Sequence, residues 1–159
     1  MAVGATHVSA KFVSNMSLTA LASLWATNTI KAAVMTNAVV PAVADSDPRW
    51  GAGGVQNYST AEVTAGGNYA AGGVTVAGCT STLSGAVASL NATSPITVAA
   101  NAANPTGAYW LAFYDSTDAG KHVFGYMDLA GPLSLVSGLQ ININGVSSGT
   151  QPVFQGTAT

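Results

Sequence analysis

The sequence predicts a mainly β protein, an antiparallel β-sandwich or barrel with one N-terminal helix. Short segments rich in β-branched and aromatic residues recur along most of the chain, with Gly, Asn and Pro between them, which is typical of antiparallel sheets. Near the N-terminus, one segment instead has apolar residues at helical spacing. With 159 residues, the chain is expected to form a single β-rich domain, residues 1–159, with its own core.

The helical candidate covers residues 8–26. Its apolar residues, among them Leu21 and Trp25, follow one another mostly at spacings of three and four, as on one face of a helix. Ser and Asn favour helix caps over helix interiors, so Asn15 and Ser17 can divide the segment. One helix would then end near Asn15 and a second turn would start near Ser17.

The β-sandwich is expected over residues 29–156. The apolar run from Thr29 to Thr36, "TIKAAVMT", suits a central strand that is buried on both faces. The clearest hairpin is Tyr109 to Leu129, because the turn-forming residues Asp115 to Gly120 separate two aromatic-rich strands. The further predicted strands are 69–77, 83–90, 96–100, 108–115, 122–129, 138–145 and 153–155.

A long loop is expected at residues 41–58, which are rich in Pro, Asp and Gly. A loop of this length is usually ordered by a partner or by function. Trp50 lies in its middle and has two interpretations. It is an exposed anchor for a binding partner, or it folds back as a lid on the protein's own core.

Two pairs of glycines, Gly66-Gly67 and Gly72-Gly73, bracket Tyr69. Neither pair has the following Lys of a phosphate-binding loop or the helix of a dinucleotide-binding fingerprint. We therefore expect them to shape a turn and a bulged strand entry, where positive backbone φ angles are needed. Tyr69 itself is either part of the core or part of an interface.

Charged residues make up only 6% of the chain, against roughly 25% in ordinary globular domains. The few basic residues are scattered, which argues against nucleic-acid binding. No apolar run approaches the roughly 20 residues that a membrane-spanning helix needs, and no secretion signal is evident. Synthesis in the cytoplasm is expected. The single Cys79 is interpreted as a small apolar residue at a strand edge.

No catalytic, metal or cofactor site stands out. The pairs Asp45/Asp47 and Asp115/Asp118 are each compatible with a calcium ion, but also with an ordinary solvated turn. His122 and the one other histidine lack the spacing of a metal site, and Ser148-Gly149 is interpreted as an ordinary turn. We therefore predict that the protein is not an enzyme.

Three segments, in this order, resemble a family of small virion proteins of tailed bacteriophages. They are the strand Ile30 to Thr36, the glycine-rich segment Glu62 to Gly78, and the hairpin Ala108 to Asp128 with Gly125-Tyr126 at its centre. From the start of the first segment to the end of the last, they extend over about two thirds of the chain. Each segment alone is only a strand and a turn. The resemblance rests on the order of the three segments together with the glycine-rich core.

The resemblance implies a non-enzymatic structural protein of the virion. It would decorate the capsid surface as a cement protein that bridges and stabilises major capsid subunits. The expected partners are the major capsid protein and further copies of this chain in a homo-oligomer, without nucleic acid, membrane, metal or cofactor. Trp50, Tyr58 and Tyr69 are the residues predicted to anchor these contacts.

Two other classes remain open. The first is a tail, neck or fibre component or a receptor- or glycan-binding module, in which Trp50, Asp45 and Asp47 would contact the ligand. The second is a hydrolase, whose activity would have to depend on His122 or Asp115.

Overall fold

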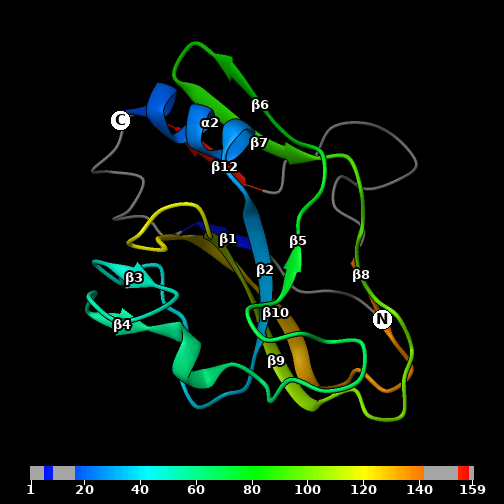
Figure 1. Cartoon of the computed structure of the whole chain (residues 1–159). Coiled ribbons are helices and arrows are strands. Elements are labelled where there is room, and N and C mark those ends of the chain that lie inside the picture. Colours follow the sequence, from blue (N-terminus) through cyan, green and yellow to red (C-terminus); the bar gives the residue numbers. More distant parts are fainter. Residues whose placement is uncertain (1–5, 9–16, 142–153, 158–159) are drawn as a thin grey trace.

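The computed structural model of the chain describes residues 6–8, 17–141 and 154–157 (Figure 1). This part of the chain is mainly β with one α-helix, as the sequence predicts. Its elements are β1 (Thr6–Val8), α2 (Leu18–Thr27), β2 (Ile30–Met35), β3 (Pro48–Arg49), β4 (Gln56–Asn57), the 3-10 helix η1 (Tyr58–Ala61), β5 (Val74–Thr75), β6 (Cys79–Ser84), β7 (Val87–Ala92), β8 (Ile96–Val98), β9 (Thr106–Asp115), β10 (Val123–Ser134), β11 (Leu139–Ile141) and β12 (Phe154–Thr157).

The largest sheet has five antiparallel strands in the order β1-β10-β9-β2-β5. Its centre is the predicted hairpin β9–β10, with β2 paired to β9 from Ile30 opposite Asp115 to Met35 opposite Trp110. All residues of β2 except Lys31 are buried, which confirms a strand covered on both faces. The run of small and aliphatic side chains in β2 allows this double burial.

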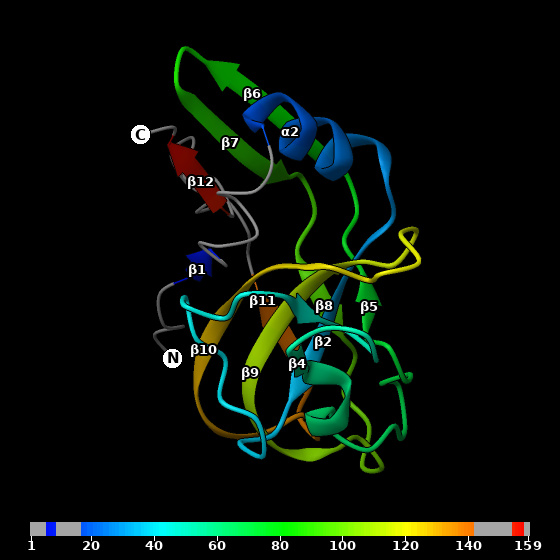
Figure 2. The ribbon, with the colours of Figure 1, turned by 90° about the vertical axis from the view of Figure 1, so that its left-hand side faces the viewer.

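A second layer lies above this sheet in Figures 1 and 2 and consists of α2 and the sheet β12-β7-β6. The helix packs on the β6–β7 hairpin, where the Ser81 hydroxyl donates a hydrogen bond to the Ala22 carbonyl at 2.8 Å. The indole N–H of Trp25 donates to the Asn91 carbonyl at 2.7 Å. The small sheet β11-β8 completes the structure beside the large one.

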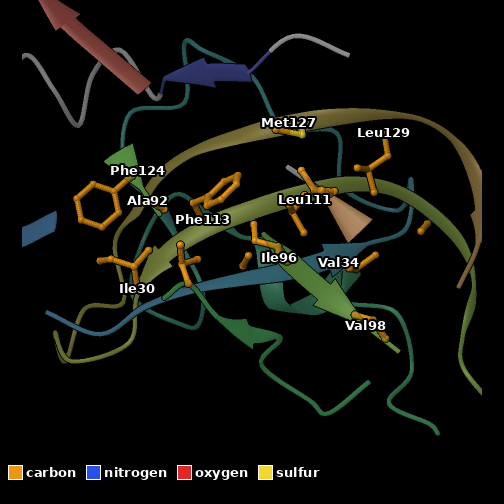
Figure 3. Packing of buried hydrophobic residues seen from close by; sticks show 14 of the residues in the cluster. Ile30, Val34, Ala92, Ile96, Val98, Leu111, Phe113, Phe124, Met127 and Leu129 are labelled. Atoms are coloured by element: carbon orange, nitrogen blue, oxygen red, sulfur yellow. The ribbon is translucent and has the colours of Figure 1, made fainter. Parts of the chain in front are cut away.

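The main core fills the space between these layers (Figure 3). Alternate residues of β2 and β9, such as Val34 and Phe113, face it from the large sheet, while Ile96 comes from β8. A smaller cluster on the opposite face of β2 and β9 includes Met35 and Tyr114, and segment 41–61 covers it. The large sheet is therefore covered on both faces at its centre.

The helix begins where Ser17 predicts. Ser17 is the N-cap, and its hydroxyl accepts a hydrogen bond from the Ala20 N–H at 3.2 Å. The predicted helix 8–26 is wrong at Val8, which lies in β1 and pairs with Gly125 of β10. Residues 9–16 of that prediction lie outside the described residues. No helix of the described part is long and apolar enough to cross a membrane.

Two predicted strands are wrong. The predicted strand 83–90 contains a turn at Gly85-Ala86, so it is the tip of the β6–β7 hairpin. Gly85 has a φ of +57°, which glycine adopts readily at the first central position of such a two-residue turn. In the predicted strand 69–77, only Val74 and Thr75 pair as a strand. Half of the predicted strand 138–145 and the start of 153–155 lie outside the described residues.

Candidate functional site

The predicted loop 41–58 is attached to the large sheet by backbone contacts. It contains the short parallel pair β3–β4, which the sequence analysis missed. The backbone N–H of Trp50 donates to the Lys121 carbonyl at 2.9 Å, and Arg49 forms a bridge with His122. The loop is therefore attached to the turn between β9 and β10.

Trp50 and Tyr58 are buried by this arrangement. Trp50 is 4% exposed and stacks on Tyr114, with ring centroids 5.0 Å apart and an interplanar angle of 13°. Tyr58 is fully buried, and its hydroxyl donates a hydrogen bond to the Asp45 carboxylate. The structure thus favours the lid interpretation of Trp50. Both rings complete the protein's own core, and their predicted role as anchors for a partner stays a prediction.

Tyr69, the third predicted anchor, is also buried, with 2% of its surface exposed. Its hydroxyl accepts a hydrogen bond from the Val34 N–H at 2.8 Å and donates one to Glu62 Oε1 at 2.9 Å. The same Glu62 oxygen accepts from the Gly72 N–H at 2.7 Å. Burial and the neighbouring Glu62 carboxylate raise the pKa of Tyr69 above its ordinary value, so the hydroxyl stays protonated. Tyr69 joins the glycine-rich segment to β2.

We expect Tyr69→Phe to lower the free energy of unfolding by about 1–3 kcal/mol, because it leaves the buried Val34 N–H without its acceptor and removes a donor to Glu62. Urea denaturation followed by circular dichroism measures this. The matched control is Tyr109→Phe, at a half-buried tyrosine of β9. Equal, small effects of the two changes would refute the structural role of the Tyr69 hydroxyl.

Ionisable side chains gather where the loop meets the β9–β10 turn. Arg49 Nε lies 3.0 Å from Asp47 Oδ1, and His122 Nε2 lies 3.8 Å from the same oxygen. His122 Nδ1 contacts the Asp118 carboxylate on its other side. The hydrogen bond from Arg49 to Asp47 raises the pKa of the guanidinium further. These groups pair with one another, which attaches the loop to the turn.

The carboxylate pairs considered for calcium serve the fold instead. Asp45 faces Tyr58 and Asp47 faces Arg49, so the two do not converge. Asp115 is 2% exposed; it accepts hydrogen bonds from the Asn28 amide at 2.6 Å and from the backbone N–H groups of the following turn. Within residues 17–141, no group of three or more His, Cys, Asp or Glu side chains is placed to hold a metal ion.

Asp118 makes the stabilisation by the cluster of Asp47, Arg49, Asp118 and His122 depend on pH. Partial burial works to raise the pKa of Asp118, but the Gly120 N–H and the His122 side chain outweigh it, so the pKa lies below its ordinary value. A carboxylate with a lowered folded-state pKa stabilises the fold above its unfolded value of about 3.9. This stabilisation is lost as the pH falls through the lower folded-state pKa.

We therefore expect Asp118→Asn to cost less than about 1 kcal/mol at pH 7, since the carboxylate is partly exposed, and to cost progressively less toward pH 2. Thermal melts of wild type and variant between pH 7 and pH 2 measure the difference. Asp128→Asn is the control at another partly exposed carboxylate. A difference between wild type and Asp118→Asn that grows on acidification would contradict the assignment.

Cys79 behaves as the small apolar residue that the sequence predicts. It is half-buried beside the main core, and its thiol lies 3.4 Å from the Val76 carbonyl. Burial raises the pKa of the Cys79 thiol to about 11. The reactive thiolate is therefore a minor species at neutral pH.

Charge is distributed very unevenly over the fold. The chain has four basic and six acidic residues, yet none of them lies in residues 12–30, 63–114 or 129–159. The entire second layer, with α2, β6, β7 and β12, is therefore uncharged, as are β8 and β11. Many of its exposed positions are small and polar, including Thr19, Ser23, Thr80, Thr82 and Ser84. The absence of charge from these segments can be read directly from the sequence.

In comparisons with known proteins, no family model matches the chain, and neither does any curated protein or solved structure. The resemblance to phage virion proteins therefore remains a prediction from the three segments quoted above.

Proposed function

We propose that this protein is a non-enzymatic structural protein of a tailed-bacteriophage virion, which decorates the capsid and bridges neighbouring major capsid subunits. The observation that carries the proposal is the uncharged layer formed by α2, β6, β7 and β12. A surface rich in Ser, Thr and Ala and without charges packs against a protein lattice with no like-charge repulsion and no ions to desolvate. The resemblance of the three segments points to the same class.

Several ionisable groups have structural partners that account for their presence without a reaction. Glu62 fixes Tyr69 and Gly72, Asp115 caps the turn after β9, and His122 lies between two carboxylates. Side chains used in this way hold loops on the sheet. A rigid exterior of this kind suits a protein that works by burying surface in a symmetric array.

Binding to the assembled shell would stabilise it by mass action. A protein that binds the assembled state and not the dissociated one favours assembly by about 2.7 kcal/mol per site when its free concentration is 100 times Kd. Many sites on one shell multiply this effect. Even weak individual contacts then protect the whole particle.

The glycan-binding alternative loses the residues expected to carry it. Trp50 is stacked on Tyr114, Asp45 accepts from Tyr58, and Asp47 pairs with Arg49. Trp50 is buried, and both carboxylates, although partly exposed, already have partners within the chain. A location in the tail or neck is left as the main competitor, because an uncharged docking layer suits those sites equally well.

The proposal is tested by adding the purified protein to virions produced without its gene. We expect saturable binding to isolated heads, and a higher temperature of DNA release from the heads that bind it. Isolated tails from the same preparation are the control for location. Binding to tails but not to heads would replace capsid decoration by the tail or neck alternative, and binding to neither would refute a structural role in the virion.

A further inference from the structure

The outer edge of β6 is the most unusual part of the uncharged layer. β6 pairs with β7 along all six of its residues, from Cys79 opposite Ala92 to Ser84 opposite Val87. Its other edge has no strand partner among the described residues. This edge belongs to the hairpin that projects at the top of Figures 1 and 2.

The direction of each backbone group of β6 follows from the hairpin. The two-residue turn makes Ser84 and Val87 a hydrogen-bonded pair, and such pairs alternate along an antiparallel ladder. The bond from the Thr93 N–H to the Gly78 carbonyl at 3.1 Å fits the same alternation at the far end of the hairpin. The backbone N–H and C=O groups of Cys79, Ser81 and Leu83 therefore point away from β7.

This edge lacks the features with which proteins usually prevent strand pairing. Natural edge strands carry a charge, a proline or a bulge, or are very short. β6, "CTSTLS", has no charged residue and no proline, and its register with β7 is regular. Leu83 is 50% exposed on it. An unprotected edge of six residues is a template for another strand.

We propose that β6 pairs antiparallel with β6 of a second copy of this chain, across a two-fold axis at Ser81. The three outward-facing residues are spaced evenly around Ser81. In this register Ser81 lies opposite the second copy's Ser81, and Cys79 lies opposite Leu83 in both directions. All outward-facing N–H and C=O groups of β6 thereby form hydrogen bonds. The β12-β7-β6 sheets of the two copies become one continuous sheet.

The surroundings of the edge favour a second copy as its partner. A copy brings the same uncharged surface, so the approach meets no like-charge repulsion. Among the side chains of the neighbouring helix α2 whose burial is described, the exposed ones are small and uncharged, as at Thr19, Ser23 and Ala26. The exposed Leu83 is covered beside Cys79 of the other copy. This pairing does not depend on the proposed virion function.

Cross-linking tests the register directly. In this pairing Thr80 lies opposite Thr82 of the second copy, as a non-hydrogen-bonded pair with Cα atoms about 4.5 Å apart, within disulfide range. We expect a mixture of the Thr80→Cys and Thr82→Cys proteins, both also carrying Cys79→Ser, to form a covalent dimer under mild oxidation. Each protein alone should cross-link far less, because identical residues are not opposite each other at these positions.

A charge on the edge tests the contact without cysteines. We expect sedimentation equilibrium to show a dimer for the wild-type protein and at least tenfold weaker association for Leu83→Lys. Val136→Lys is the matched control, since Val136 is also exposed and lies outside this hairpin. A wild-type protein that stays monomeric at high concentration overturns the proposal. A dimer that Leu83→Lys leaves intact, or a mixture that does not cross-link, overturns it as well.

Discussion

Replacing Gly73 with valine is expected to lower the free energy of unfolding by about 3–5 kcal/mol, which combines backbone strain with overpacking. Gly73 has a φ of +76°, a conformation that β-branched residues strongly disfavour. A Cβ at this position would lie 2.2 Å from the Ala32 carbonyl oxygen and 2.6 Å from the Ala33 Cα. Both obstacles are backbone atoms of the central strand β2, which cannot move aside without disturbing the large sheet.

The matched control for Gly73→Val is Gly85→Val. Gly85 also has a positive φ, +57°, but a Cβ there would meet no atom within 4 Å. The control therefore carries the backbone strain alone, about 1–2 kcal/mol. Thermal melts of both variants measure the difference. If Gly73→Val melts at the wild-type temperature, or no lower than Gly85→Val, the close approach of the glycine-rich segment to β2 is wrong.

Trp25→Ala is the second change with a large expected effect, about 3–5 kcal/mol for loss of a fully buried tryptophan. The Trp25 ring is 0% exposed and packs edge-on against Phe124, with centroids 5.4 Å apart, and against Phe113 at 6.4 Å. Its N–H also donates to the Asn91 carbonyl of β7. One side chain of α2 thus contacts both the large sheet and the sheet β12-β7-β6, so its removal weakens the packing between the two layers.

Trp110→Ala is the control for Trp25→Ala. Trp110 lies on β9, is partly exposed, packs edge-on against Tyr126 at 5.9 Å and donates to Asn37 at 3.2 Å. We expect its loss to cost clearly less, about 1–2 kcal/mol, because solvent already reaches the ring. Urea denaturation measures both variants. An equal cost for the two tryptophans would contradict the central position of Trp25.

The fold class was predictable because it depends on local patterns. The apolar run of β2, the turn-rich centre of the β9–β10 hairpin and the cap at Ser17 each show in a few neighbouring residues. The β6–β7 turn was missed because its Gly85-Ala86 centre is not one of the strong turn dipeptides, such as Asn-Gly. The pairing of β1 with β10 joins residues far apart in the chain, and no local pattern encodes it.

The burial of the three predicted contact anchors could not be predicted from the sequence for a related reason. Sequence shows that Trp50 and Tyr58 lie in a loop-like segment, but their burial depends on Tyr114, Lys121 and Asp45. These partners come together only when the segment folds back onto the sheet. The role of Tyr69 depends in the same way on Val34 and Glu62, although the doubled glycines correctly predicted positive φ angles around it.

The proposed function is tested most directly by quantitative mass spectrometry of heads and tails, separated from purified particles of the tailed bacteriophage in which the proposal places the protein. A capsid decoration protein must be present in heads at a copy number comparable to that of the major capsid protein. We expect that abundance in the head fraction and near absence from the tail fraction. A few copies per particle, recovered with tails or the neck, or no copies at all, would contradict the proposal.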